Sequence, residues 1–122
     1  MLGFTPKIKK EIIHLLRKQV GNNFLLIAFG SLARRQEKRS SDIDLALYIA
    51  NPLSPVTIVE IREELNTKIH TLKDIDVIDL ADGGIDSNLL GNILKEGIIW
   101  HKPKNSKELL ESLKRRLINT EK

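Results

Sequence analysis

The chain has 122 residues, enough for one compact domain, and its 41% hydrophobic and 30% charged residues are typical of a globular protein rather than a disordered one. It has no cysteine, which excludes disulfides and thiolate metal sites. No apolar run approaches the roughly 20 residues that span a bilayer, and the N-terminus lacks the pattern of a signal peptide, so we expect a cytoplasmic protein. The net charge of +4 suits an acidic partner, but the basic residues are dispersed and aromatic residues are only 4%, which disfavours direct nucleic acid binding.

The first two predicted elements are a helix and a buried strand. Residues 7–19 place four apolar side chains on one helical face, and Gly21 is expected to end this helix. The continuous apolar run 24–29 indicates a strand that is buried on both faces. After Gly30, Ser31 is suited to cap a short helix. The apolar face of the first helix consists of Ile8, Ile12, Leu15 and Leu16.

Strands and helices continue to alternate along the rest of the chain. The expected elements are a strand at 42–49, a helix from Ser54-Pro55 to about Leu72, a strand at 74–80, a helix at 87–97, a strand at 98–101 and a helix at 106–117. This alternation predicts an α/β fold, with a small sheet of about four strands flanked by helices in a single domain, residues 1–122. The strand order cannot be read from the pattern.

A Gly-Ser pair stands where the first strand ends. Gly30 allows the backbone to approach a ligand closely, and Ser31 adds a hydroxyl group. The N-terminus of the expected helix adds unpaired N–H groups and the positive end of the helix dipole. Together these features predict a phosphate-binding turn.

Two aspartates follow after ten intervening residues. Asp42 and Asp44 are two positions apart on one strand, so they share a face, with their Cα atoms roughly 6.5 to 7 Å apart. Two carboxylates directed at one place repel each other unless a cation lies between them. Mg²⁺ is bound through one or two carboxylates together with substrate phosphates. The combination predicts metal-assisted phosphoryl or nucleotidyl transfer.

A further carboxylate could complete a site for two metal ions. The strand at 74–80 contains three aspartates, of which Asp74 and Asp76 share a face while Asp79 points the other way. An acid in an apolar strand is costly unless it is paired or coordinated. We select Asp76 as the third carboxylate and keep Asp79 as the reserve.

The stretch "GS" at 30–31, ten residues and "DID" at 42–44 resembles the signature of the DNA polymerase β-like nucleotidyltransferase superfamily. "FGSLAR…SDIDLAL", "IDVIDL" and "ILKEGIIWHK" are similar to its smallest branch, the minimal nucleotidyltransferases. The resemblance implies a mixed sheet in the nucleotidyltransferase fold, Ser31 on the nucleotide phosphate, and Mg²⁺ on Asp42 and Asp44, with Asp76 as the third ligand. It also implies ATP as the donor and two Mg²⁺ ions.

Basic residues fill the segment between the Gly-Ser pair and the aspartates. We include Arg34 with Gly30 and Ser31 as a nucleotide contact, although a solvated run of charges explains the same pattern. Arg35 stands where many relatives have Gly, and this departure leaves the proposed ligands intact. The three histidines lack the spacing of metal ligands.

Minimal nucleotidyltransferases commonly act as antitoxins beside a HEPN-domain ribonuclease toxin. The resemblance therefore implies an antitoxin that forms a hetero-oligomer with such a toxin and transfers AMP to one of its tyrosines. Two alternatives stay open. One is transfer to a small molecule such as an aminoglycoside with a helical partner subunit, and the other is a non-catalytic binding module that neutralises its partner by contact.

Overall fold

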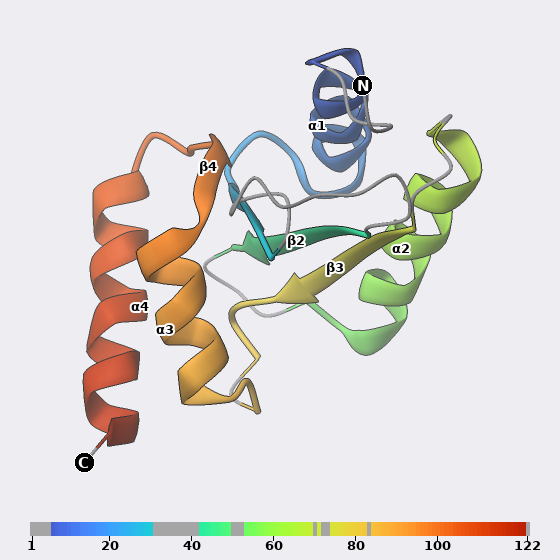
Figure 1. Cartoon of the computed structure of the whole chain (residues 1–122). Helices are drawn as coiled ribbons and strands as arrows, with labels where there is room; N and C mark the ends of the chain where they lie inside the picture. The colour runs from blue at the N-terminus through green and yellow to red at the C-terminus, as the bar shows by residue number, and fades with distance from the viewer. Residues whose placement is uncertain are drawn as a thin grey trace.

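The computed structural model describes residues 6–30, 42–49, 53–69, 71, 74–82 and 84–121. Helices and strands alternate along the chain (Figure 1). The described residues form eight elements, which are α1 (Pro6–Val20), β1 (Leu25–Phe29), β2 (Ile43–Tyr48), α2 (Pro55–Lys68), β3 (Ile75–Asp79), α3 (Ser87–Glu96), β4 (Ile98–His101) and α4 (Ser106–Glu121). All eight correspond to elements expected from the sequence. The short helix expected after Ser31 lies outside the described residues.

The four strands form one mixed sheet in the order β3-β2-β1-β4. β1 pairs antiparallel with both β2 and β4, whereas β2 and β3 are parallel. The parallel pair is possible because α2 carries the chain back to the starting end of the sheet between these two strands. β3 is therefore an edge strand, and β2 lies in the interior of the sheet.

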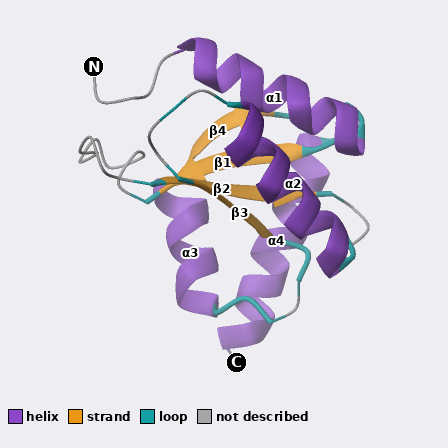
Figure 2. Ribbon diagram, turned by 90° about the vertical axis from the view of Figure 1, so that its right-hand side faces the viewer, coloured by secondary structure: helices purple, strands orange, loops and turns teal. Residues whose placement is uncertain are grey.

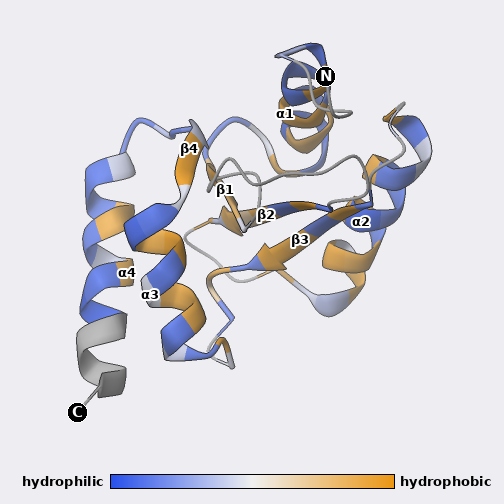
Figure 3. Cartoon of the chain, in the orientation of Figure 1, coloured by the Kyte–Doolittle hydropathy of each residue, from blue (hydrophilic) through white to orange (hydrophobic). Residues whose placement is uncertain are grey.

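Two pairs of helices cover the two faces of the sheet (Figure 2). One apolar core lies under α1 and α2, and the other lies under α3 and α4. β1 contributes alternate side chains to both cores, which is why its residues Leu25 to Ala28 are all buried. The colouring by hydropathy follows this division, with apolar residues on the helix faces that meet the sheet (Figure 3).

Local signals in the sequence set most of the helix ends. Gly21, with a φ of 81°, follows α1, and its N–H donates to the carbonyl of Arg17. The Ser54 hydroxyl accepts a hydrogen bond from the N–H of Thr57 at the start of α2. α2 ends at Lys68, earlier than expected, because Ile69 adopts an extended conformation and is buried, with 5% of its surface exposed. None of the helices in the described part of the chain has the length and apolar character needed to cross a bilayer.

Candidate active site

The pairing of β2 with β3 brings two of the predicted carboxylates together. Asp44 and Asp76 are direct partners in the parallel register. Neighbouring strands lie about 5 Å apart, so these side chains start close together. Both point to the face covered by α3 and α4, because Asp44 alternates in phase with buried Ala46 and Asp76 in phase with buried Leu80. Two acids side by side on a sheet face destabilise each other unless a cation offsets their charge.

Asp42 adds a third negative charge beside Asp44. It lies two residues before Asp44, directly ahead of the first residue of β2, and is exposed. Burial raises the pKa of Asp44 above its ordinary value of 3.8, and the negative charges of Asp42 and then Asp76 raise this pKa further. Among these three aspartates, Asp44 lies in the centre, and its ionised form is the one that its surroundings disfavour.

The turn after β1 lies against the carboxylate of Asp44. Phe29 pairs with Asp44 in the antiparallel register, and Gly30 follows it with a φ of 74°. A Cβ atom at Gly30 would lie 2.5 Å from Oδ2 of Asp44. Only glycine fits here, both for its left-handed conformation and for the space. Ser31 and Arg34, the other predicted nucleotide contacts, lie outside the described residues.

A small hollow adjoins this turn on the same face of the sheet. Its volume is about 140 Å³, and α3 provides most of its wall. The lining residues are Phe29, Gly30, Leu89, Asn92, Ile93 and Glu96. Space for part of a ligand therefore lies beside Gly30, on the sheet face that carries Asp44 and Asp76.

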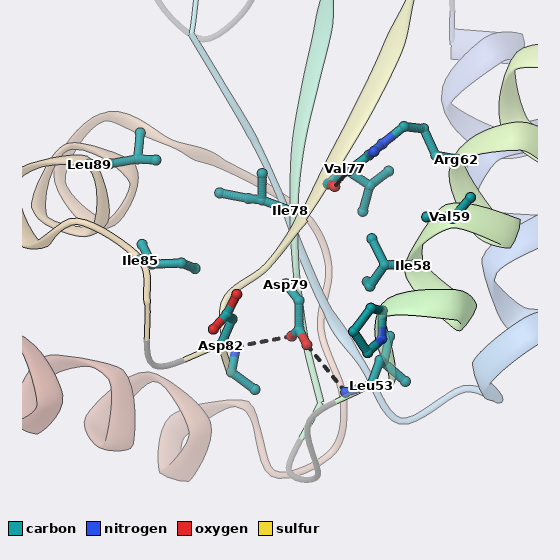
Figure 4. A pocket seen from close by; sticks show the side chains of 12 residues that line it. Leu53, Ile58, Val59, Arg62, Val77, Ile78, Asp79, Asp82, Ile85 and Leu89 are labelled. Carbon is teal, nitrogen blue, oxygen red and sulfur yellow. Dashed lines mark hydrogen bonds between the residues drawn. The ribbon is translucent and has the colours of Figure 1, made fainter.

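Asp79, the reserve for the third carboxylate, occupies the opposite face of β3. It is 9% exposed, its Oδ1 accepts the N–H of Ala81 at 3.0 Å, and its Oδ2 accepts the N–H of Leu53 at 3.2 Å (Figure 4). Both oxygens are used to hold the turns at the end of β3 and before α2. Geometry thus separates Asp79 from Asp44 and leaves Asp76 beside it.

Two residues of α2 reach Asp76 and its neighbours, and the sequence reading did not identify them. The Nε atom of Arg62 lies 3.1 Å from Oδ1 of Asp76, and Asn66 bonds the backbone of Ile75. Their signal in the sequence is a spacing of four residues on one helix, which places them on one side of α2. This spacing alone does not predict a contact with β3, because it does not show that β3 is the strand beside α2.

The donor set suits a hard divalent cation. Carboxylate oxygens are the ligands Mg²⁺ prefers, and the raised pKa of Asp44 identifies a place where added positive charge would be stabilising. Among the residues that the structure describes, no three acidic or histidine side chains form a preassembled metal cluster. The fit therefore rests on the pair Asp42 and Asp44, with Asp76 at the neighbouring register position.

Comparison with known proteins gives related sequences and folds. The sequence model described as "Polymerase beta, Nucleotidyltransferase" matches residues 10–105. The protein adenylyltransferase MntA of Shewanella oneidensis is 32% identical over 72 residues, which are 59% of this chain and 50% of that protein. The match thus spans half the length of this curated relative.

Solved structures extend the similarity across the fold. A crystal structure of a toxin–antitoxin with AMP-PNP has a TM-score of 0.75 at 24% identity, covering 93% of this chain and 86% of that chain. A tri-AMPylated Shewanella oneidensis HEPN toxin in complex with an MNT antitoxin gives 0.69 at 23% identity, covering 94% and 84%. At these identities the structures show the shared fold alone. With the family model matching most of its length, the chain belongs to the polymerase β nucleotidyltransferase family.

Proposed function

We propose that this protein is a Mg²⁺-dependent nucleotidyltransferase that transfers AMP from ATP to a tyrosine of a HEPN-type toxin in the cytoplasm, and so acts as its antitoxin. The observation that carries the chemistry is the register pairing of Asp44 with Asp76 beside the Gly30 turn. Support for the acceptor comes from the relative named as a protein adenylyltransferase and from the fold shared with an antitoxin bound to an AMPylated HEPN toxin.

The roles of the residues follow from their positions. Asp42 and Asp44 would hold the metal ion that gathers the triphosphate, and Asp44 with Asp76 would hold a second one near the acceptor hydroxyl. Mg²⁺ at these carboxylates supplies charge neutralisation of the phosphates and activation of the attacking oxygen. Gly30 leaves room for the Asp44 carboxylate beside the turn. We assign Ser31 and Arg34 to the phosphates of the donor.

The transfer itself requires an in-line displacement. The tyrosine oxygen, having lost its proton to solvent, attacks the α-phosphorus of ATP. The new O–P bond forms as the bond between the α-phosphorus and the α,β-bridging oxygen breaks, and pyrophosphate leaves. The hollow between Gly30 and α3 lies on the sheet face that carries the carboxylates, and we assign it to part of the donor nucleotide. Most of the rate acceleration in such a site comes from positioning and from charge stabilisation.

The test uses ATP labelled on the α-phosphate, Mg²⁺, the purified protein and lysate from its host. We expect a labelled protein band that disappears with the double variant Asp42→Asn/Asp44→Asn, whose folding is checked by circular dichroism. Identification of a tyrosine in a small helical protein as the labelled residue would complete the assignment. No labelled protein with the folded wild type would overturn it, and label on a small molecule instead would select the aminoglycoside-type alternative.

A further inference from the structure

The free edge of β3 is covered by two side chains of α2. Along this strand the even-numbered residues bond to β2, as the carbonyl of Asp74 and the N–H of Leu80 do. The odd-numbered residues present their N–H and C=O groups to the edge of the sheet. Asn66 pairs with this edge at Ile75. Its Nδ2 donates to the carbonyl of Ile75 and its Oδ1 accepts the N–H of Ile75, each at 2.8 Å.

Arg62 lies one helical turn before Asn66 and binds the next edge-facing residue of β3, Val77. Its Nη2 donates to the carbonyl of Val77 at 3.1 Å, and Figure 4 shows the side chain extending from α2 toward this strand. Its Nε lies 3.1 Å from Oδ1 of Asp76. The residues before and after Asp76 are thus tied to α2, and so is the Asp76 carboxylate itself.

The contact between Arg62 and Asp76 crosses from one face of the sheet to the other. α2 packs against the face opposite Asp76, so Arg62 reaches the carboxylate around the edge of β3. The Nε atom is buried and forms no hydrogen bond of good geometry among the described residues, which leaves the ion pair with Asp76 as its interaction. At 44% and 52% exposure, the two side chains gain little stability from this pair in water.

An exposed ion pair of low stabilising value still orients a charged side chain. Asp76 is repelled by Asp44, its register partner, and half of its side chain faces solvent. The terminal torsion of an aspartate is broad, so a half-exposed carboxylate adopts several orientations unless a partner restrains one oxygen. Arg62 holds Oδ1 and leaves Oδ2 available to a ligand.

We propose that Arg62 is the positioning residue of the third carboxylate, with Asn66 fixing the backbone on the other side of Asp76. The inference rests on the proposed nucleotidyl transfer and names a residue that acts on it through Asp76. Arg62 has no contact of its own with the nucleotide in this role. A small error in the placement of a ligand lowers the rate of such a reaction strongly.

The kinetic test compares Arg62→Met with Lys68→Met. Both variants remove one cation from α2, but Lys68 is exposed and pairs with Glu64 on its own helix at 3.6 Å. We expect Arg62→Met to lower kcat about tenfold with the KM for ATP changed less than about twofold, while Lys68→Met stays near wild type. Arg62→Met should have no further effect in the Asp76→Asn background. Equal kcat for the two variants, or a full further loss in that background, would overturn the proposal.

Metal binding gives a readout that does not depend on activity. Mn²⁺ titrated by electron paramagnetic resonance, with a non-hydrolysable ATP analogue present, should bind more weakly at its second site in Arg62→Met, by roughly three- to tenfold. A role through charge alone predicts the opposite sign, because removing a nearby cation favours a second cation. Tighter or unchanged second-site binding would therefore contradict positioning. Wild-type protein that binds Mn²⁺ but transfers no AMP would reject the proposed function while this titration still decides the role of Arg62.

Discussion

Asp76 and Asp79 lie three residues apart on one strand, on opposite faces of the sheet, and differ in burial and in bonding partners. Asp79 is 9% exposed and receives a backbone N–H on each oxygen, whereas Asp76 is half exposed and faces the carboxylate of Asp44. A carboxylate surrounded by donors stabilises the fold, but a carboxylate placed against another one costs stability. The difference separates an acid whose oxygens hold the backbone from an acid whose proposed role is to bind a cation.

The largest expected effect is the loss of activity on removing the central charge. Asp44→Asn should lower AMP transfer by at least about a hundredfold, since single electrostatic groups in active sites are worth that much. Asp79→Asn removes the same charge from the other face of the sheet, and it should retain activity within about threefold when corrected for folded protein. Steady-state transfer rates measure both. Near-normal activity in Asp44→Asn would reject the assigned role of this carboxylate.

The substitution Gly30→Ala tests whether the turn beside Asp44 belongs to the active site. Alanine there must adopt a φ of 74° and places its Cβ 2.5 Å from Oδ2 of Asp44, so either the turn or the carboxylate shifts. We expect at least about a tenfold loss of transfer, with a loss of about 1–3 kcal/mol in unfolding free energy from the strained backbone. Gly21→Ala is the matched control, because Gly21 has a φ of 81° but open space around it. Equal losses of activity in the two variants would show that Gly30 acts through stability alone.

Asp79 should matter for stability rather than for chemistry. Asp79→Ala leaves the N–H groups of Leu53 and Ala81 without their acceptor, which should cost about 1–3 kcal/mol of unfolding free energy. Asp82→Ala removes a comparable but exposed turn contact with the N–H of Gly84, and its cost should stay below about 0.5 kcal/mol. Urea denaturation measures the two variants. A smaller cost for Asp79→Ala than for Asp82→Ala would be contrary to the structural role.

The smallest effect is a dependence of stability on pH. The pKa of Asp44 is raised in the folded state, so the native protein binds more protons than the unfolded chain between pH 3.8 and that raised value. Stability therefore falls as the pH rises through this window and stays lowered above it. In EDTA, Asp44→Asn should gain Tm relative to wild type as the pH increases from about 4 to 7. A difference in Tm that does not vary with pH would contradict the raised pKa.

Local patterns in the sequence predicted the elements because each carries its own signal. The apolar face of α1, the buried run of β1 and the Ser54-Pro55 start of α2 depend only on neighbouring residues. The predicted sheet content and its flanking helices are confirmed by the structure and by the fold of the solved relatives.

The assembly of the site depends on contacts distant in sequence, which no local pattern contains. The sequence predicted Asp76 on a strand near that of Asp44, but their direct pairing depends on the parallel register of β2 with β3. The ion pair of Arg62 with Asp76 depends on β3 being the edge strand next to α2. The close approach of Gly30 to Asp44 required both the turn and the pairing of β1 with β2.

The most direct test of the contrast between the two acids is anomalous scattering from crystals grown with Mn²⁺ and a non-hydrolysable ATP analogue. We expect manganese peaks coordinated by Asp42 and Asp44, with Asp76 bound to the second ion and Asp79 still bonded to backbone N–H groups. Manganese coordinated by Asp79, or bound nucleotide with no manganese at Asp44, would contradict the assignment of this face of the sheet as the active site.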